Sequence, residues 1–129
     1  MMNMLTIIAV ASGGAIGATL RLLINSTVNK HVEHTLPFGT LTVNLLGSLI
    51  IGMLFAYFHL NDHLSPHIKT FMITGILGAL TTYSTFAIES FFLLESGEYM
   101  HAFINMALNV FGTILLAGIG YLFILNFTK

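Results

Sequence analysis

The 129-residue chain has no cysteine, no tryptophan and very few charged residues. Without cysteine it cannot form a disulfide or a thiolate metal site. Only 7% of its residues are charged, whereas a water-soluble domain has about 25%. Such a chain cannot cover a water-facing surface, and its net charge of −1 provides no basic patch for nucleic acid. The composition therefore predicts a membrane protein.

Apolar sequence is abundant, since 56% of the residues are hydrophobic. Spanning the hydrocarbon core takes about 20 helical residues, so this length allows four helices and no separate soluble domain. We expect an all-α membrane protein with a single transmembrane domain over 1–129. Its helices are expected at about 5–24, 38–60, 67–94 and 99–127. The first apolar segment lacks the positively charged start of a signal peptide, which favours a spanning helix.

The third apolar segment contains a stretch that is too polar for an ordinary spanning helix. Between Gly75 and Phe86 the sequence reads GILGALTTYSTF, in which hydroxyl residues follow two glycines. Backbone groups freed at membrane depth are tolerated only where protein or a water-filled path covers them. We expect the third helix to break midway within this stretch, and the break to be the functional centre.

Small and polar residues recur every four positions on the second and fourth helices, which places them on one side of each helix. These residues are Thr40, Asn44, Ser48 and Gly52, and then Asn105, Asn109 and Thr113. Stripes of this kind are expected to face protein rather than lipid. On the first helix, Gly13 and Gly17 have the spacing that allows another helix to approach closely.

Lysine and arginine, which normally set the orientation of a membrane protein, are nearly balanced between the two sides. Lys69 and Lys129 are expected on one side, with Lys30 and Arg21 on the other. This balance favours insertion in both orientations and hence an antiparallel homodimer; a single orientation set by residues at the helix ends is the alternative. Four helices of this length cannot enclose a pore and also pack together, so a transport path is expected to need a dimer.

Polar residues inside these helices have both functional and structural interpretations. The NH2 group of Asn44 can bind an anion without a counter-charge, or it can form an interhelical hydrogen bond. Tyr83, Phe86 and Glu89 share a helical face, where positive ring edges can attract a small anion and ordinary aromatic packing is the alternative. Glu89 and Arg21 are either functional intramembrane charges or side chains that reach the membrane interface.

Three motifs cover the three polar regions: Gly13-Gly14-x-x-Gly17-Ala18-x-x-Arg21, Gly39-Thr40-Leu41-x-Val43-Asn44-x-x-Gly47 and Gly75-x-x-Gly78-x-x-Thr81-Thr82-Tyr83-Ser84-Thr85-Phe86. In order, spacing and placement they resemble the Fluc (CrcB) fluoride channel family, and the resemblance covers the whole chain. It implies a fluoride-selective channel that exports fluoride passively across a bacterial inner or plasma membrane and relieves fluoride toxicity. It also implies an antiparallel, dual-topology homodimer surrounded by membrane lipid.

The resemblance further implies residues that bind two ions. The backbone carbonyls of Gly78 and Thr81 from both subunits would hold a structural sodium ion at the dimer interface, and carbonyls freed by a helix break suit a cation. Asn44 would lie on the fluoride path, with Tyr83 and Phe86 as edge-on contacts. The other residues along or beside the path would be Arg21, Ser84, Thr85, Glu89, Asn105 and Asn109.

The chain departs from the family pattern at two places. Tyr83 stands where phenylalanine is usual, and Asn105 and Asn109 replace a tyrosine and a serine on the fourth helix. Both asparagines keep hydrogen-bonding capacity. A proton-coupled small multidrug transporter is the alternative, but it needs an acid in its first helix, whereas the first acid here is Glu33 in a loop. No catalytic constellation is present, so an enzyme is not expected.

Overall fold

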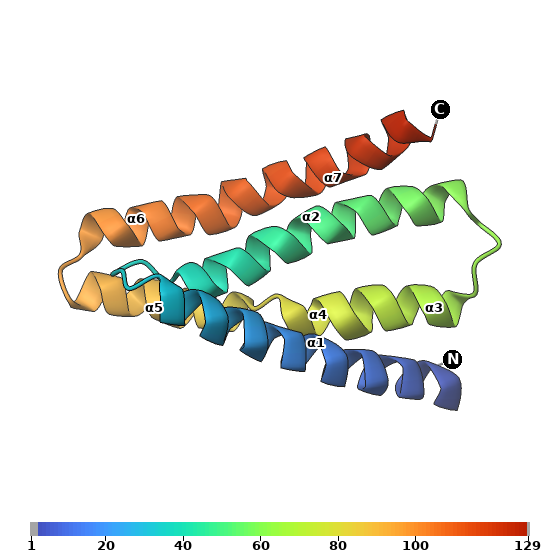
Figure 1. Cartoon of the computed structure of the whole chain (residues 1–129), viewed down its shortest axis with the longest axis horizontal. Coiled ribbons are helices and arrows are strands. Elements are labelled where there is room, and N and C mark those ends of the chain that lie inside the picture. Colours follow the sequence, from blue (N-terminus) through green and yellow to red (C-terminus); the bar gives the residue numbers. More distant parts are fainter. Residues whose placement is uncertain (1–2, 129) are drawn as a thin grey trace.

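The computed structural model describes residues 3–128. Its helical segments run back and forth along one long axis (Figure 1). Four of them are long and apolar enough to cross a membrane, namely Met4–His31, Phe38–Leu60, Pro66–Glu95 and Tyr99–Phe127. The predicted all-α membrane fold is therefore confirmed. Lys129, which entered the charge balance, lies outside the described residues.

Helix α1 (Met4–His31) begins at Asn3, whose Oδ1 accepts a hydrogen bond from the Thr6 nitrogen at 2.9 Å. It continues to His31, beyond the predicted end near residue 24. The reason is a tertiary contact. Asn29 donates to Asn25 Oδ1 at 2.9 Å and accepts a hydrogen bond from the Gly39 nitrogen at 3.1 Å, which holds the last turns of α1 against the start of α2.

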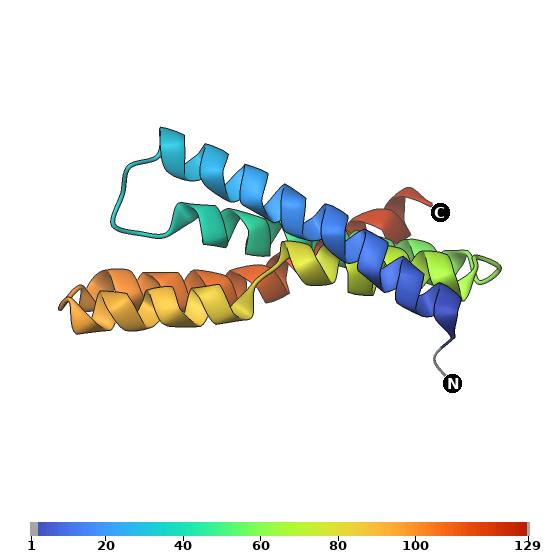
Figure 2. The same ribbon diagram turned by 90° about the horizontal axis from the view of Figure 1, so that it is seen from below.

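The first helix crosses the third membrane-spanning segment and packs against it (Figure 2). Gly13 and Gly17 are its buried residues, as their spacing predicted. A Cβ atom on Gly13 would lie 2.5 Å from the carbonyl oxygen of Phe71, and one on Gly17 would clash with that of Ile76. The absence of side chains at these two positions lets the two backbones meet.

Helix α2 (Phe38–Leu60) occupies the predicted range 38–60 and lies beside the fourth segment. That segment consists of α6 (Tyr99–Ala107), a π-helical turn η2 (Leu108–Gly112) and α7 (Thr113–Phe127). Gly52 approaches the Ala117 carbonyl and Gly120 approaches the Leu49 carbonyl so closely that neither position has room for a Cβ atom. The glycines therefore set the spacing between α2 and α7.

The third segment is composite. It comprises α3 (Pro66–Thr70), a π-helical stretch η1 (Phe71–Leu77), the single turn α4 (Gly78–Leu80) and α5 (Tyr83–Glu95). Thr81 and Thr82 between α4 and α5 have extended backbone angles, with ψ values of 155° and 110°. We refer to these two residues as the interruption; the ribbon narrows there in Figures 1 and 2.

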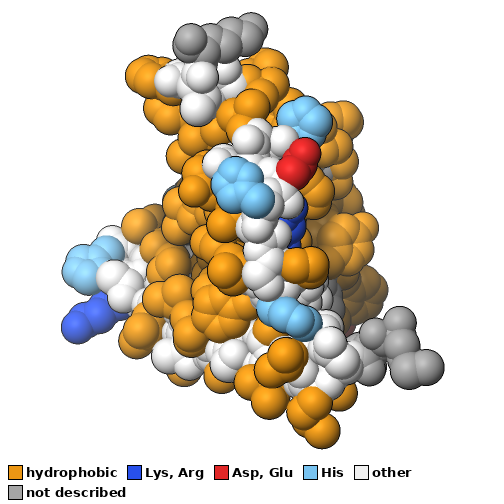
Figure 3. All heavy atoms as spheres, turned by 90° about the vertical axis from the view of Figure 1, so that its right-hand side faces the viewer, with side chains coloured by type: hydrophobic (Ala, Val, Ile, Leu, Met, Phe, Trp, Pro, Cys, Tyr) orange, Lys and Arg blue, Asp and Glu red, His pale blue; other side chains and the backbone are white. Residues whose placement is uncertain are grey.

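Most large apolar side chains face outward rather than into a core. The small core cluster contains Val43, Leu77 and Leu80, whereas many leucine, isoleucine and phenylalanine side chains on every long helix are exposed. Figure 3 views the end that contains the α2–α3 connection, where histidine, lysine and aspartate side chains gather with hydrophobic side chains around them. An apolar belt with polar ends is the surface expected of a protein embedded in lipid.

Candidate functional site

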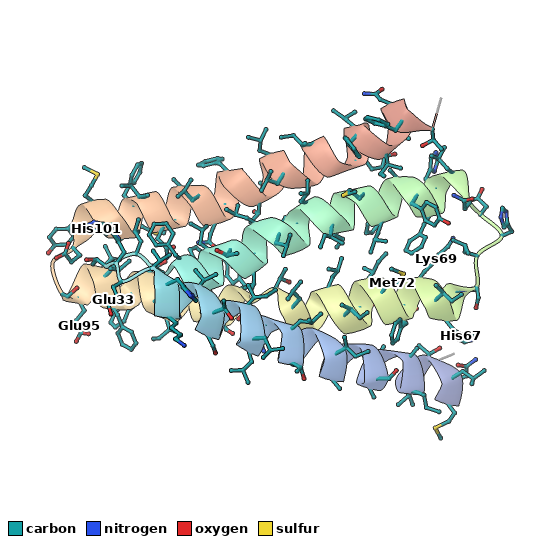
Figure 4. The ribbon with its side chains drawn as sticks, viewed as in Figure 1. Glu33, His67, Lys69, Met72, Glu95 and His101 are labelled. Atoms are coloured by element: carbon teal, nitrogen blue, oxygen red, sulfur yellow. The ribbon has the colours of Figure 1, made fainter. Side chains whose placement is uncertain are left out.

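A cavity of about 470 Å³ lies at the interruption, between α2, the third segment and the fourth segment. Its polar lining is provided by Asn44, Ser48, Thr81, Thr82, Asn109 and Thr113. Tyr83 and Phe86 also line it. Among the described residues, no aspartate, glutamate, lysine, arginine or histidine lines this cavity; Glu33, Glu95 and His101 lie toward one end of the bundle, and His67 and Lys69 lie toward the other (Figure 4). The polar surface of the cavity is therefore uncharged.

Asn44 closes the interruption from the neighbouring helix. Its Oδ1 accepts a hydrogen bond from the Thr82 nitrogen at 2.8 Å, and its Nδ2 donates to the Thr82 oxygen at 3.1 Å. Both backbone groups of Thr82 are thus satisfied by one buried carboxamide. Thr82 in turn caps α5, because its Oγ1 accepts a hydrogen bond from the Thr85 nitrogen at 3.3 Å.

A continuous series of buried hydrogen bonds runs from Asn44 into the fourth segment. Asn44 Nδ2 donates to Asn109 Oδ1 at 2.8 Å, and Asn109 Nδ2 donates to both Asn105 O and Asn105 Oδ1 at 3.0 Å. Asn105 Nδ2 donates to Ser90 Oγ at 3.0 Å, which donates to the Phe86 oxygen at 2.8 Å. We call this series the amide chain. It links the N-cap of α5 to Phe86, one turn further along the same helix.

The structure therefore joins three of the predicted site residues, Asn44, Asn105 and Asn109. For Asn44 it displays the interhelical hydrogen bonds that the sequence offered as one interpretation, and both of its N–H groups have protein acceptors. Ser90 was missed as a site residue. Its signal was a serine within a membrane-spanning helix, where a hydroxyl commonly bonds the carbonyl four residues back.

Tyr83 and Phe86 form an edge-to-face pair, with ring centroids 5.3 Å apart and ring planes at 75°. The two rings differ in environment, because Phe86 is 6% exposed whereas Tyr83 is 78% exposed. One ring is consequently fixed inside the helical bundle, and the other projects from the surface of the single chain. Ser84 beside them is also exposed, while Thr85 is half-buried and receives a hydrogen bond from Thr82 Oγ1 at 2.9 Å.

Glu89 lies one turn beyond Phe86 and contacts α2. Its Oε1 accepts a hydrogen bond from the buried Thr40 hydroxyl at 2.9 Å, and its Oε2 is buried with no hydrogen-bond partner among the described residues. A second cavity of about 440 Å³ lies between α5 and the α1–α2 connection, with Glu89, Glu95, Thr35 and Ser96 among its lining residues. The acid thus stands between the interruption and one end of the bundle.

The carbonyl groups of Gly78 and Thr81 have lost their normal helical donors. In an α-helix these would be the N–H groups of Thr82 and Thr85. Those N–H groups instead donate to Asn44 Oδ1 and Thr82 Oγ1. Gly78 is also an exposed residue of the single chain. These two oxygens are suitable for a cation, whereas Arg21, half-buried on α1, lies outside the amide chain.

Residues 8–121 match the family described as CrcB-like protein, Camphor Resistance (CrcB). A "Fluoride-specific ion channel FluC" from Sulfurimonas denitrificans is 55% identical over 120 residues, covering 93% of each chain. The protein of the same name from Nautilia profundicola is 47% identical over 116 residues, covering 90% of this chain and 91% of that one. One from Campylobacter jejuni serotype O:23/36 is 50% identical over 117 residues, covering 91% and 95%.

Proposed function

This chain belongs to the CrcB family, and from that membership we propose that it is a fluoride-selective channel. It lets fluoride leave the cell passively and so relieves fluoride toxicity. The observation that carries the proposal is the high identity with proteins named fluoride-specific ion channels along nearly the whole length of both chains. The function is that of a multi-pass membrane protein rather than an enzyme, and we propose the bacterial inner or plasma membrane as its location.

The fluoride path passes the cavity at the interruption. The NH2 group of Asn44, which now bonds Thr82 O and Asn109 Oδ1, can turn a donor to an anion there, and the rings of Phe86 and Tyr83 have positive edges, all without a fixed positive charge that would trap the ion. A small anion can exchange its water for these partners in steps, whereas chloride is too large for close contact with all of them. Conduction also requires each contact to be weak enough to release the ion.

Other polar residues line the remainder of the path. Thr85 and Ser84 supply hydroxyl groups on the first turn of α5, and Glu89 with Thr40 stands toward one end. Arg21 attracts anions into a vestibule. Asn109 lies beside Asn44, and Asn105 lies beside Asn109. The series of uncharged donors through the middle of the bundle supports an anion path.

The channel is an antiparallel homodimer with dual topology, surrounded by lipid, and with a structural sodium ion at its interface. The carbonyls of Gly78 and Thr81 from both subunits bind that ion. Their lack of helical donors and the exposure of Gly78 support this assignment. Sodium bound there stabilises two interrupted helices and offsets part of the cost of a nearby anion.

The small multidrug transporter is not favoured, because α1 contains Arg21 and has no acidic residue to exchange protons. Fluoride efflux from liposomes that contain the purified protein tests the proposal, with chloride-loaded and protein-free vesicles as controls. We expect rapid loss of fluoride with chloride retained. Absence of fluoride efflux from a folded dimer in sodium would overturn the assignment.

A further inference from the structure

Asn44 has no free donor in the described structure. One proton of its Nδ2 group is directed to the Thr82 oxygen, and the other is directed to Asn109 Oδ1 at 2.8 Å. Both asparagines are buried and both line the cavity at the interruption. An anion that binds Asn44 there must take one of these two N–H groups from its present acceptor.

Of the two acceptors, Asn109 is the one that can lose its hydrogen bond to Asn44 without uncapping the interrupted helix. Thr82 O belongs to the interruption itself, and Asn44 also binds the Thr82 nitrogen, so this pair of bonds caps the free helix ends. Asn109 Oδ1 belongs to a side chain on another segment. Releasing it costs a single side-chain hydrogen bond and leaves the cap on Thr82 in place.

The orientation of Asn109 is fixed by the rest of the amide chain. Its Nδ2 donates to both oxygens of Asn105, so its Oδ1 is the atom that faces Asn44. Asn105 is fixed in turn, because its own Nδ2 donates to Ser90 Oγ. Rotating the Asn109 amide by half a turn would place two NH2 groups against each other. Asn109 is therefore held as an acceptor toward Asn44.

We propose that Asn109 Oδ1 is an internal substitute for fluoride, which holds the second N–H of Asn44 between ions and is displaced by each ion that passes. This inference rests on the proposed fluoride channel. An unpaired N–H in a membrane interior is costly, and the carbonyl of Asn109 removes that cost when no ion is present. Fluoride then exchanges one hydrogen bond for another, which keeps its binding weak enough for release.

The proposal makes a prediction opposite to that for an ordinary path residue. If Asn109 were simply a fluoride ligand, removing its side chain would weaken fluoride binding. If it competes with fluoride, removing it frees the Asn44 donor, so fluoride binds more tightly and leaves more slowly. The two roles are distinguished by how current depends on fluoride concentration.

The test compares wild type with Asn109→Ala in planar bilayers over a series of fluoride concentrations. We expect the half-saturating concentration to fall about three- to tenfold, which corresponds to one neutral hydrogen bond. The maximal current is expected to fall as well. Asn109→Val repeats the test with a bulkier side chain, which leaves less room for a water molecule to replace the lost amide. It also provides the test if the alanine variant does not assemble.

Thr42→Val is the matched control. It removes a hydroxyl from α2 that donates only to Phe38 O in the same helix, at 2.7 Å. It is expected to leave the half-saturating concentration unchanged. If wild type conducts fluoride, but an assembled Asn109→Ala or Asn109→Val variant has an unchanged or raised half-saturating concentration, the inference is overturned and the proposed channel function still stands. Absence of fluoride current in wild type would overturn the proposed function and this inference with it.

Discussion

The carboxamide of Asn44 and the backbone of Thr82 are joined by two hydrogen bonds, of 2.8 Å from the Thr82 nitrogen and 3.1 Å to the Thr82 oxygen. One side chain on α2 thus completes the backbone of an interrupted helix on another segment. A residue in this position has a structural role before any ion arrives, and its substitution has two consequences that can be measured separately.

Replacing Asn44 with alanine is expected to reduce fluoride efflux and to lower thermal stability, with the dimer still formed. The change leaves a buried N–H and a buried carbonyl of Thr82 without partners, each costing about 1–3 kcal/mol. Liposome efflux and thermal unfolding of the same preparation measure the two effects. Asn61→Ala, at the residue that follows the end of α2, is the control, because the Asn61 side chain bonds only Tyr57 O in the adjacent last turn.

Undiminished efflux in Asn44→Ala would remove this residue from the fluoride path. Reduced efflux with unchanged thermal stability would contradict the capping role instead. The control variant is expected to match wild type in both measurements, because its hydrogen bond is local and exposed.

Much of this architecture was predictable because membrane helices carry simple signals. The range 38–60 and the buried faces of Gly13, Gly17 and Asn44 followed from hydrophobic length and from residue spacing. The continuation of α1 to His31 was not predicted, since it depends on a contact between Asn29 and Gly39 that no local pattern contains.

The candidate site was predictable in composition but not in connectivity. Spacing placed Asn105 and Asn109 on one side of the fourth helix, but it contained no information on which amide donates and which accepts. That polarity depends on Ser90 from another segment, which donates to Phe86 O and accepts a hydrogen bond from Asn105. Hydrogen-bond direction is a property of the assembled bundle, which explains why the role of Ser90 emerged only from the structure.

The close approach of α1 and the third segment gives a second prediction. Gly17→Ala would force a Cβ atom against the Ile76 carbonyl, and backbone atoms on both sides cannot move aside cheaply. Overpacking of this kind costs about 1–3 kcal/mol, so we expect lower thermal stability and less folded protein. Gly14→Ala is a matched control, because a Cβ atom there meets nothing within 4 Å. Equal losses in the two variants would contradict this packing.

Substitutions at Phe86 and Tyr83, the two aromatic residues of the cavity, are expected to affect fluoride efflux to different degrees. Phe86→Leu removes a buried ring whose positive edge would contact fluoride on the proposed path, and it should lower fluoride efflux strongly. Tyr83→Phe keeps the ring and removes only the hydroxyl, so efflux should stay near wild type. Phe91→Leu, at an exposed ring on the same helix, controls for loss of an aromatic residue. Equal efflux in Phe86→Leu and Phe91→Leu would exclude a special role for Phe86.

Sodium removal tests the assignment of the carbonyls at the interruption. An ion bound only by the folded dimer stabilises it by an amount that grows with concentration, about 2.7 kcal/mol at one hundred times its dissociation constant. We therefore expect the melting temperature of the dimer to be higher in sodium than in potassium at equal ionic strength. The Thr82 and Thr85 nitrogens donate to side chains rather than to the Gly78 and Thr81 oxygens, so these oxygens would be available to a sodium ion. Identical melting in the two salts would argue against a sodium site there, whatever the fluoride efflux.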